Sequence, residues 1–313
     1  MKESILQKIK EFLQTHLKGG APLLLGLSGG PDSMALLHLL LNCQLPLDIQ
    51  VAHVDHGWRP ESRKEAEWLQ ERVSLPFHLH RLEGVGQDEA SAREERLKFF
   101  SGLYQKLGGQ ALLLGHQAED QAETVLKRIF EGGNVLSLRG MAPISSLRGM
   151  TLWRPLLGVR KQELVAWLEQ RGIPYLKDPS NLDPKYLRAK MRVSILPELS
   201  KSFGKEIQGN LIRLGQTAQE LKEYFDKKLA AYGAQVKRDR GEVHIDLNPL
   251  YPFERVELKA FLKRLSDEEA LGLSHEALGT LARLLEEGRV PLRRISCRKK
   301  LEVADRRIAI KSV

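Results

Sequence analysis

The sequence of 313 residues predicts an α/β fold in which a doubly wound parallel sheet is followed by a smaller, mostly helical C-terminal domain. Short apolar runs alternate with helix-length segments through the first half of the chain, which is the pattern of βα units. Glycine-rich or polar residues follow several of these runs directly, and parallel sheets bind ligands at the carboxyl ends of their strands. Beyond about residue 200, charged helical segments replace the alternation, and a short β-rich tail, EVADRRIAI, closes the chain.

The order of elements follows from the apolar pattern. Strands are predicted at residues 22–27, 47–54, 76–82 and 110–115, and helices at about 33–42, 61–73, 89–107 and 117–131. The N-terminal segment MKESILQKIKEFLQTHL has apolar residues at helical spacing and interspersed acids, so it predicts a packed surface helix rather than a signal peptide. A domain boundary is expected near residue 205, which divides the chain into domains 1–205 and 206–313.

Composition narrows the class of protein. The chain is 42% hydrophobic and 28% charged, as in soluble globular proteins, and no apolar run approaches the roughly 20 residues of a membrane span. The two cysteines, Cys43 and Cys297, form no C-x-x-C motif, zinc quartet or disulfide framework. We therefore expect a protein of the reducing cytoplasm. So few cysteines also argue against sulfur transfer, and Cys43, within an apolar helix, is expected in the core.

The segment SGGPDS at residues 28–33 follows the first predicted strand and opens the first of the sheet's helices. Its glycines permit positive φ and a close approach of the backbone to a ligand, and a helix N-terminus offers N–H donors to an oxyanion. Asp32 would repel a phosphate unless a cation intervenes, so Mg²⁺ is expected there. The alternative is an ordinary turn in which Asp32 or Ser33 caps the helix. No GxxxxGK followed by Ser or Thr occurs, which excludes the usual mononucleotide P-loop.

Two further strand ends carry polar clusters. In VAHVDHGWR, His53 and His56 flank Asp55, but residues three apart on an extended segment point in different directions, which disfavours a metal site. The backbone there, at Ala52 and His53, is expected to border the adenine of a bound nucleotide.

The other cluster is GHQAEDQAET. His116, Asp120 and Glu123 stand at i, i+4 and i+7, which places them on one helical face within about 40°. Acids that complement the helix dipole are the alternative, and they account for Glu119 and Asp120 but not for Glu123 or His116.

The net charge of +9 suggests a polyanionic partner. The segment GRVPLRRISCRKK at residues 288–300 concentrates basic residues without an acid, and we expect it to contact nucleic acid. The alternative is a solvated edge strand protected by charged residues. Six basic residues make up this segment: Arg289, Arg293, Arg294, Arg298, Lys299 and Lys300.

SGGPDS resembles the SGGxDS loop of the PP-loop, or N-type, ATP pyrophosphatases, which cleave ATP between its α- and β-phosphates. Together with HVDHGWR, AREERL, GHQAEDQAET, WRPLLGVRKQEL and GIPYLKDPSNLDPKYLRAKMRVSILPEL, it stands in the order found in the tRNA(Ile)-lysidine synthetase family. These segments span most of the first 200 residues, and the remainder resembles the short-form family's C-terminal domain only loosely. The resemblance implies an adenine nucleotide alpha hydrolase-like fold, with a catalytic domain at 1–205 and a tRNA-binding domain at 206–313.

The resemblance also implies the reaction, in which ATP activates the wobble cytidine of an isoleucine tRNA with a CAU anticodon and L-lysine is ligated to carbon 2 of the base. An ammonium of pKa about 10.4 is not nucleophilic, so one group must accept its proton while a carboxylate positions it. Asp120 and Glu123 fit these tasks and are expected to bind lysine. His116 would shuttle the proton or bind phosphate, and Arg93 would offset charge on the α-phosphate.

The remaining expected roles concern ATP and tRNA. ATP is expected to contact Ser28, Gly29, Gly30, Pro31, Asp32, Ser33, Ala52 and His53, with Mg²⁺ on Asp32. tRNA is expected to contact Arg188, Arg192, Arg293, Arg294, Arg298, Lys299 and Lys300. For Arg93 and Arg96, salt bridges with Glu89 or Glu94 are the alternative.

Three departures from the family pattern stand at flanking positions: Leu97 for a tyrosine, Ala189 for an asparagine, and Glu119 for the first of two aspartates. Two other readings of the chain remain open, a different PP-loop enzyme of tRNA such as a thiolase, and a non-catalytic nucleotide- or RNA-binding module. The sequence leaves the oligomeric state open, a homodimer included.

Overall fold

The computed structural model describes residues 4–82, 89–177, 183, 185–288, 292–296 and 299–312. The chain divides into two compact units, Met1–Thr217 and Ala218–Val313. The division falls within a long helix, α9 (Ile207–Gly233). The functional boundary expected near residue 205 stays a prediction. None of the helices in the described ranges is long and apolar enough to cross a membrane.

The first unit is built on a six-stranded sheet in which the four predicted strands are all present. Its order is β3-β2-β1-β4-β6-β5, and all neighbours are parallel except β5 and β6. The hairpin of β5 and β6 extends the sheet beyond the strands that the sequence predicts. The strands are β1 (Leu23–Gly26), β2 (Ile49–Asp55), β3 (Phe77–Arg81), β4 (Ala111–Leu113), β5 (Ile144–Leu147) and β6 (Met150–Trp153).

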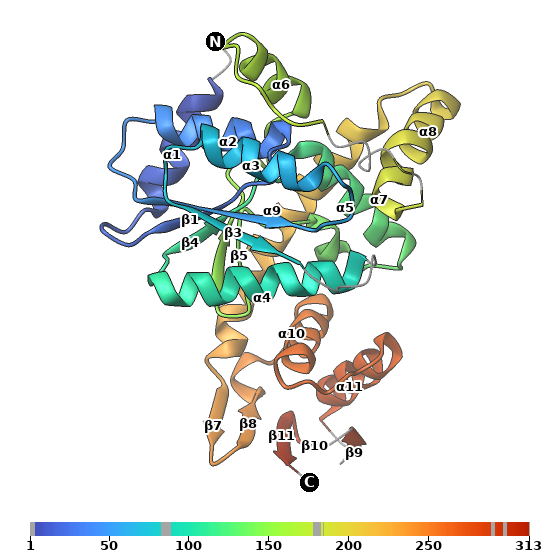
Figure 1. The fold of residues 1–313 in the computed structure, drawn as a ribbon. Helices are drawn as coiled ribbons and strands as arrows, with labels where there is room; N and C mark the ends of the chain where they lie inside the picture. The colour runs from blue at the N-terminus through green and yellow to red at the C-terminus, as the bar shows by residue number, and fades with distance from the viewer. Residues whose placement is uncertain are drawn as a thin grey trace. The chain divides into compact units, whose positions relative to one another are not determined.

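Helices cover both faces of this sheet, as a doubly wound fold requires (Figure 1). One face packs against α1 (Ile5–His16), α2 (Pro31–Asn42), α3 (Ser62–Arg72) and α6 (Lys161–Glu169), and the other against α4 (Glu89–Leu107). The alternation of β1 explains this, because Leu23 and Leu25 join the cluster of α2 while Leu24 joins that of α4.

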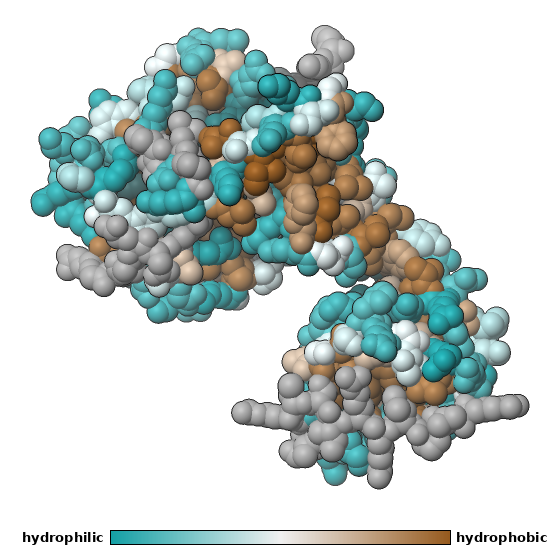
Figure 2. All heavy atoms as spheres, turned by 90° about the vertical axis from the view of Figure 1, so that its right-hand side faces the viewer, coloured by the Kyte–Doolittle hydropathy of each residue, from teal (hydrophilic) through white to brown (hydrophobic). Residues whose placement is uncertain are grey.

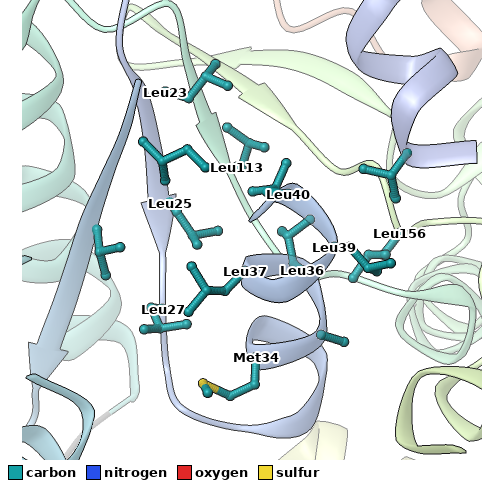
Figure 3. Packing of buried hydrophobic residues seen from close by; sticks show 14 of the residues in the cluster. Leu23, Leu25, Leu27, Met34, Leu36, Leu37, Leu39, Leu40, Leu113 and Leu156 are labelled. Atoms are coloured by element: carbon teal, nitrogen blue, oxygen red, sulfur yellow. The ribbon is translucent and has the colours of Figure 1, made fainter. Parts of the chain in front are cut away.

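Helix α2 is buried almost all round because it lies between the sheet and two further helices. Figure 3 shows Leu36, Leu37 and Leu40 of α2 packed against the leucines of β1 and β4. Cys43, just past the end of α2, is buried in this core as predicted. The packing holds the first turn of α2, and with it the SGGPDS segment, rigidly at the carboxyl end of β1.

The rest of the unit is helical and supports one side of the site. It comprises α5 (Ala118–Phe130), η1 (Val135–Arg139), α7 (Leu187–Lys190), η3 (Met191–Ile195), α8 (Leu196–Phe203) and the start of α9. An apolar cluster joins Ala122, Val125 and Leu126 of α5 to Leu196 and Leu211. The turn η3 is a π-helix just before Pro197, which has no N–H to donate to an earlier carbonyl.

The second unit pairs two helices, α10 (Arg255–Glu268) and α11 (His275–Glu287), with a five-stranded antiparallel sheet of order β7-β8-β11-β10-β9. The expected tail forms β10 and β11, and β9 is an edge strand. The apolar pattern does not predict β7, β8 and β9, because these strands are short and rich in charged residues. The strands are β7 (Val236–Asp239), β8 (Glu242–Asp246), β9 (Leu292–Ser296), β10 (Lys299–Ala304) and β11 (Arg307–Ser312); the short turn η4 (Asn248–Leu250) follows β8.

Candidate active site

The SGGPDS segment forms a tight loop that the two serines close. The Oγ of Ser33 lies 3.1 Å from that of Ser28 and donates to the carbonyl of Gly30 at 3.1 Å. The helix begins at Pro31, with Gly30 as its N-cap at φ −68°, so Gly30 does not use the positive φ that glycine permits. Helix α2 therefore begins directly after this loop, and the start of a helix leaves N–H groups without intrahelical partners, as an anion site requires.

Gly29 is the position in this loop where only glycine fits. Its φ is +81°, and a Cβ there would lie 2.6 Å from Cδ1 of Leu176. The carbonyl of Gly29 also accepts a hydrogen bond from the N–H of Leu176 at 2.8 Å. The segment that resembles the family beyond residue 172 is thus fastened directly to the loop.

The end of β4 approaches the same loop through a second glycine. A Cβ at Gly115 would lie 3.0–3.1 Å from backbone atoms of Asp32 and Ser33. This close approach brings the strand end that carries His116 to the loop that carries Asp32. Two of the predicted clusters therefore share one site at the carboxyl ends of neighbouring strands.

Asp32 is a carboxylate with an unsatisfied oxygen. Its Oδ1 is buried and has no hydrogen-bond partner among the described residues, while Oδ2 lies 3.7 Å from Nζ of Lys161. Burial raises the pKa of Asp32 to about 6, and Lys161 opposes this rise. An orphaned carboxylate oxygen beside a phosphate loop fits a cation. Lys161 stands in the segment WRPLLGVRKQEL but was not among the predicted site residues.

We expect Asp32→Asn to raise the thermal stability of the ligand-free protein at pH 7. Because the folded pKa is raised from 3.8 to about 6, the proton's contribution to stability is fully present below pH 3.8 and lost as the pH rises through about 6. Asparagine does not ionise, so the stability gain of the variant should grow between pH 4 and 7 by about 2 kcal/mol. Melting temperatures measured without ATP or Mg²⁺ test this, and a difference independent of pH would contradict it.

Helix α5 brings Asp120 and Glu123 together with a cation, but it begins at Ala118, so the expectation that His116 stands on the same helical face is wrong. Arg192 of η3 donates through Nε to Oε1 of Glu123 at 2.8 Å, and its Nη2 lies 3.4 Å from Oδ1 of Asp120. Glu123 is only 1% exposed in its side chain, and its Oε2 has no partner among the described residues. Burial raises the pKa of Glu123, and Arg192 opposes this rise. The face therefore binds a cationic group in a largely desolvated place.

Asp120 caps helix α5 and also lies beside Arg192, while its expected role in lysine binding stays a prediction. Its Oδ2 accepts the N–H of Gln117 at 3.1 Å, which completes a capping box at the start of α5. Its Oδ1 faces Arg192. Glu119 has a different task, because its Oε2 accepts the N–H of Lys161 at 2.9 Å. It thus fixes the segment that carries Lys161, which accounts for this departure from the family pattern.

His116 is a neutral imidazole among cations. Burial lowers its pKa to about 4; Asp120 opposes this, while Arg154, Arg188 and Arg96 lower it further. Its Nδ1 is buried without a hydrogen-bond partner in the described part of the chain. At neutral pH the ring is therefore uncharged and only a weak base, and it lies where several arginines can meet a phosphate.

The arginines around His116 come from three segments. Arg93 is exposed and lies near enough to Arg154 for its charge to lower the pKa of Arg154 further, below what burial alone causes. Glu94 pairs with Arg148 at 2.6 Å rather than with Arg93; the side chain of Glu89 is outside the described residues. Arg154 was not predicted, although it stands in WRPLLGVRKQEL. Its Nη1 is held by the carbonyl of Ala142 at 2.9 Å and by Ser145 at 2.8 Å.

The side chain of His53 joins two strand ends, while the expected contact of Ala52 and His53 with ATP stays a prediction. Both residues are buried, and Nδ1 of His53 lies 2.7 Å from the carbonyl of Leu27, so it ties β2 to the end of β1. Burial lowers the pKa of His53, which keeps the ring neutral. No group of three or more metal-ligating side chains occurs within the described ranges.

The predicted tRNA-binding residues fall into different surroundings. Arg188 is exposed on α7, whereas Arg192 is engaged with Glu123 and Asp120. Lys299 pairs with Glu269 at 2.7 Å and Lys300 with Glu302 at 3.0 Å. The side chains of Arg293 and Arg294, and the whole of Arg289 and Arg298, lie outside the described residues. Two of the five expected basic residues of the tail are therefore partly neutralised.

The first unit has an exposed apolar surface on the side formed by α5, α7 and α8. Figure 2 shows brown side chains gathered on one side of the first unit, where Figure 1 places α5, α7 and α8. Apolar patches of this kind mark interaction surfaces. The large exposed apolar residues of α5, η1, α7, η3 and α8 are Ile129, Phe130, Val135, Leu187, Val193 and Phe203.

Comparison with known proteins shows which family this chain resembles in sequence. A model of the PP-loop domain matches residues 1–199. The tRNA(Ile)-lysidine synthase of Protochlamydia amoebophila is 36% identical over 294 residues, which cover 91% of this chain and 64% of that protein. The protein of the same name from Chlamydia pneumoniae is 42% identical over 212 residues, 66% of each chain, and that from Chlamydia muridarum is 40% identical over 221 residues, 68% of each. The chain thus spans about two thirds of the length of these relatives.

Among solved structures, the tRNA thiolase NcsA from Methanococcus maripaludis with its 4Fe-4S cluster is similar in fold. The TM-score is 0.55 at 19% identity, over 69% of this chain and 78% of that chain. At this identity the likeness concerns the fold alone, and it agrees with the doubly wound sheet of the first unit.

Proposed function

The chain belongs to the tRNA(Ile)-lysidine synthetase family, and we propose from this premise that it ligates L-lysine to carbon 2 of the wobble cytidine in an isoleucine tRNA with a CAU anticodon. One observation carries the proposal: the phosphate loop and the carboxylates of α5 lie in a single site, because Gly115 brings the chain just before α5 against the backbone of Asp32 and Ser33, and the charge of Asp120 acts to raise the pKa of Asp32. ATP cleavage and amine binding can therefore occur side by side.

ATP would bind with its phosphates on the loop of residues 28–33 and its adenine near the end of β2. Asp32 would hold Mg²⁺, since a single protein carboxylate together with substrate phosphates is a usual set of magnesium ligands. When bound, Mg²⁺ would neutralise phosphate charge. Lys161, 3.7 Å from Asp32, would then turn toward the phosphates, because a lysine ammonium binds a phosphate well.

In the first step the cytidine carbonyl oxygen attacks the α-phosphorus of ATP, the bond to the β-phosphate oxygen breaks, and pyrophosphate leaves. Charge develops on the α-phosphate, where Arg93, Arg154 and Arg188 would stabilise it around the neutral His116. The adenylated oxygen makes carbon 2 of the base electrophilic.

In the second step the side-chain amine of lysine forms the bond to carbon 2, and AMP leaves. The site already holds a cation between Asp120 and Glu123, namely the guanidinium of Arg192. The lysine ammonium would share these carboxylates, and one of the neutral or anionic groups there, His116 among them, would accept its proton.

A tRNA thiolase is the second candidate, and cysteine use argues against it. Sulfur transfer needs an accessible thiolate or an iron–sulfur cluster. Cys43 is 1% exposed within the core, and Cys297 is outside the described residues. The fold shared with NcsA does not favour thiolation over ligation.

The test is to incubate the protein with ATP, Mg²⁺, labelled lysine and a CAU-bearing isoleucine tRNA transcript. Label fixed to RNA, with one AMP and one pyrophosphate released per lysine, is the expected result. A transcript with a CAU-to-GAU change serves as the control, since it lacks the wobble cytidine. Label in both transcripts, or in neither, would contradict the proposal.

The basic tail remains a predicted tRNA contact. Neutralising Arg293, Arg294, Arg298, Lys299 and Lys300 should weaken tRNA binding and flatten its dependence on salt, because phosphate contacts release counterions. ATP binding should be unchanged. Filter binding from low to moderate salt measures this, and a salt slope equal to that of the wild type would remove the segment from the RNA-binding surface.

The reaction would take place in the cytoplasm, where tRNA and ATP meet. The homodimer stays a prediction. Light scattering of the purified chain, with and without tRNA, measures it, and the exposed apolar surface on α5, α7 and α8 supports some form of association.

A further inference from the structure

The helix pair of the second unit carries a groove that no predicted site residue lines. Helices α10 and α11 lie side by side (Figure 1) and share the apolar core of the unit. A groove of about 300 Å³ runs between them, and its lining includes Arg255, Lys259, His275, Glu276, Gly279 and Arg283.

The spacing of these residues forms two facing rows. Arg255 and Lys259 stand at i and i+4 on α10, and His275, Gly279 and Arg283 stand at i, i+4 and i+8 on α11. Gly279 is a weak helix former at the middle of its row. A Cβ there would meet nothing nearer than the end of Lys259, at 3.9 Å. Core packing therefore does not require this glycine, whereas its missing side chain keeps the floor of the groove open.

The basic residues of the groove have no close acidic partner in the described part of the chain, whereas other basic residues of α10 form short ion pairs. Lys263 and Arg264 pair with Asp267 and Glu268 at 2.6 and 2.8 Å. Across the described ranges, neither Lys259 nor Arg283 forms an ion pair within 4 Å. Arg255 has only a distant partner, the carboxylate of Glu286 at 3.9 Å. Three cations thus face one lining acid, Glu276.

We propose that this groove binds the phosphate backbone of the tRNA, an inference that rests on the proposed function and gives it a second RNA contact. None of the six lining residues named above is a phenylalanine, tyrosine or tryptophan, and His275 carries the single ring among them on which a base could stack. Rows of arginine and lysine with few stacking partners can bind phosphates. Contacts to phosphates contribute affinity but do not distinguish one nucleotide sequence from another. The groove is thus a positioning surface outside the catalytic site.

The test compares two sets of substitutions in the full chain that remove equal charge. The groove variant carries Arg255→Gln, Lys259→Gln and Arg283→Gln; the control carries Lys227→Gln, Lys237→Gln and Arg240→Gln, which lie on the same unit outside the groove. Filter binding of the isoleucine tRNA should be weakened about tenfold or more by the groove variant near 0.1 M salt, with the salt slope reduced by about 2 to 3. An equal loss in both variants, or no loss in the groove variant, would overturn the proposal; no loss would point instead to an acidic protein partner.

A third variant changes shape without changing charge. Gly279→Gln fills the floor of the groove and should weaken tRNA binding, while its melting temperature stays equal or rises because glycine leaves a helix. Unchanged tRNA affinity in a stable Gly279→Gln protein would count against the groove.

Measuring the rate of lysine ligation alongside tRNA binding distinguishes a failure of this inference from a failure of the proposed function. The groove variant should need more tRNA to reach half its maximal rate but should keep the wild-type rate at saturating tRNA. A lower rate at saturating tRNA, with tRNA affinity unchanged, would contradict the proposed role of the groove. A wild-type chain that binds tRNA but forms no lysidine would remove the proposed function, and loss of binding in the groove variant would still support the groove. A wild-type chain that does not bind tRNA would overturn both.

Discussion

Glu123→Gln is expected to abolish lysine transfer while adenylation of the tRNA continues. The side chain of Glu123 is 1% exposed and 2.7 Å from Arg192, so a glutamine of nearly the same shape fits the site but brings no charge to the lysine ammonium. A carboxylate that positions an amine or takes its proton contributes about 10²- to 10⁴-fold to a rate. We therefore expect lysidine formation to fall at least about 100-fold, with AMP accumulating on the tRNA.

The two steps are measured separately with labelled ATP and labelled lysine. Glu131→Gln is the matched control, since Glu131 caps the same helix at its exposed end, 59% exposed beside Lys127; both steps should proceed normally. Equal loss of adenylation and transfer in Glu123→Gln would assign this residue to folding or to ATP binding instead.

Arg192→Met is expected to give the largest loss of stability among the charged residues of the site. Its removal leaves Glu123 buried without its cation, and breaking a buried pair costs several kcal/mol. Because the side chain of Arg192 is 26% exposed, we expect about 2 to 3 kcal/mol, or a melting temperature lower by roughly 5 to 10 °C. Methionine retains the apolar stem, so most of this loss reports the charge.

A double variant tests the cause. Adding Glu123→Gln to Arg192→Met removes the unpaired charge and should recover most of the lost stability, which is a coupling between neighbours. Arg148→Met is the control, because its pair with Glu94 is exposed and such pairs are worth less than about 1 kcal/mol. Losses that simply add in the double variant would contradict a coupled buried pair.

The sequence by itself determined the parts of this protein that depend on local pattern. The alternation of apolar runs and helices predicts the four parallel strands, and GHQAEDQAET predicts the shared face of Asp120 and Glu123 on α5, because neighbours along one helix are set by its pitch. The SGGPDS loop predicts an anion site for the same reason. Its glycines and helix start are adjacent in the chain, and Gly29 adopts the positive φ expected of it.

Only the tertiary structure decided which distant residues join these local features. Arg192, predicted to contact tRNA, reaches Glu123 from 69 positions away, and Lys161 reaches Asp32 from the start of α6. The tail lysine Lys299 pairs with Glu269 at the C-cap of α10, 30 positions away. A charge in a sequence has no partner until the chain folds, and burial, which sets the pKa of Asp32 and His116, is a property of packing rather than of residue type.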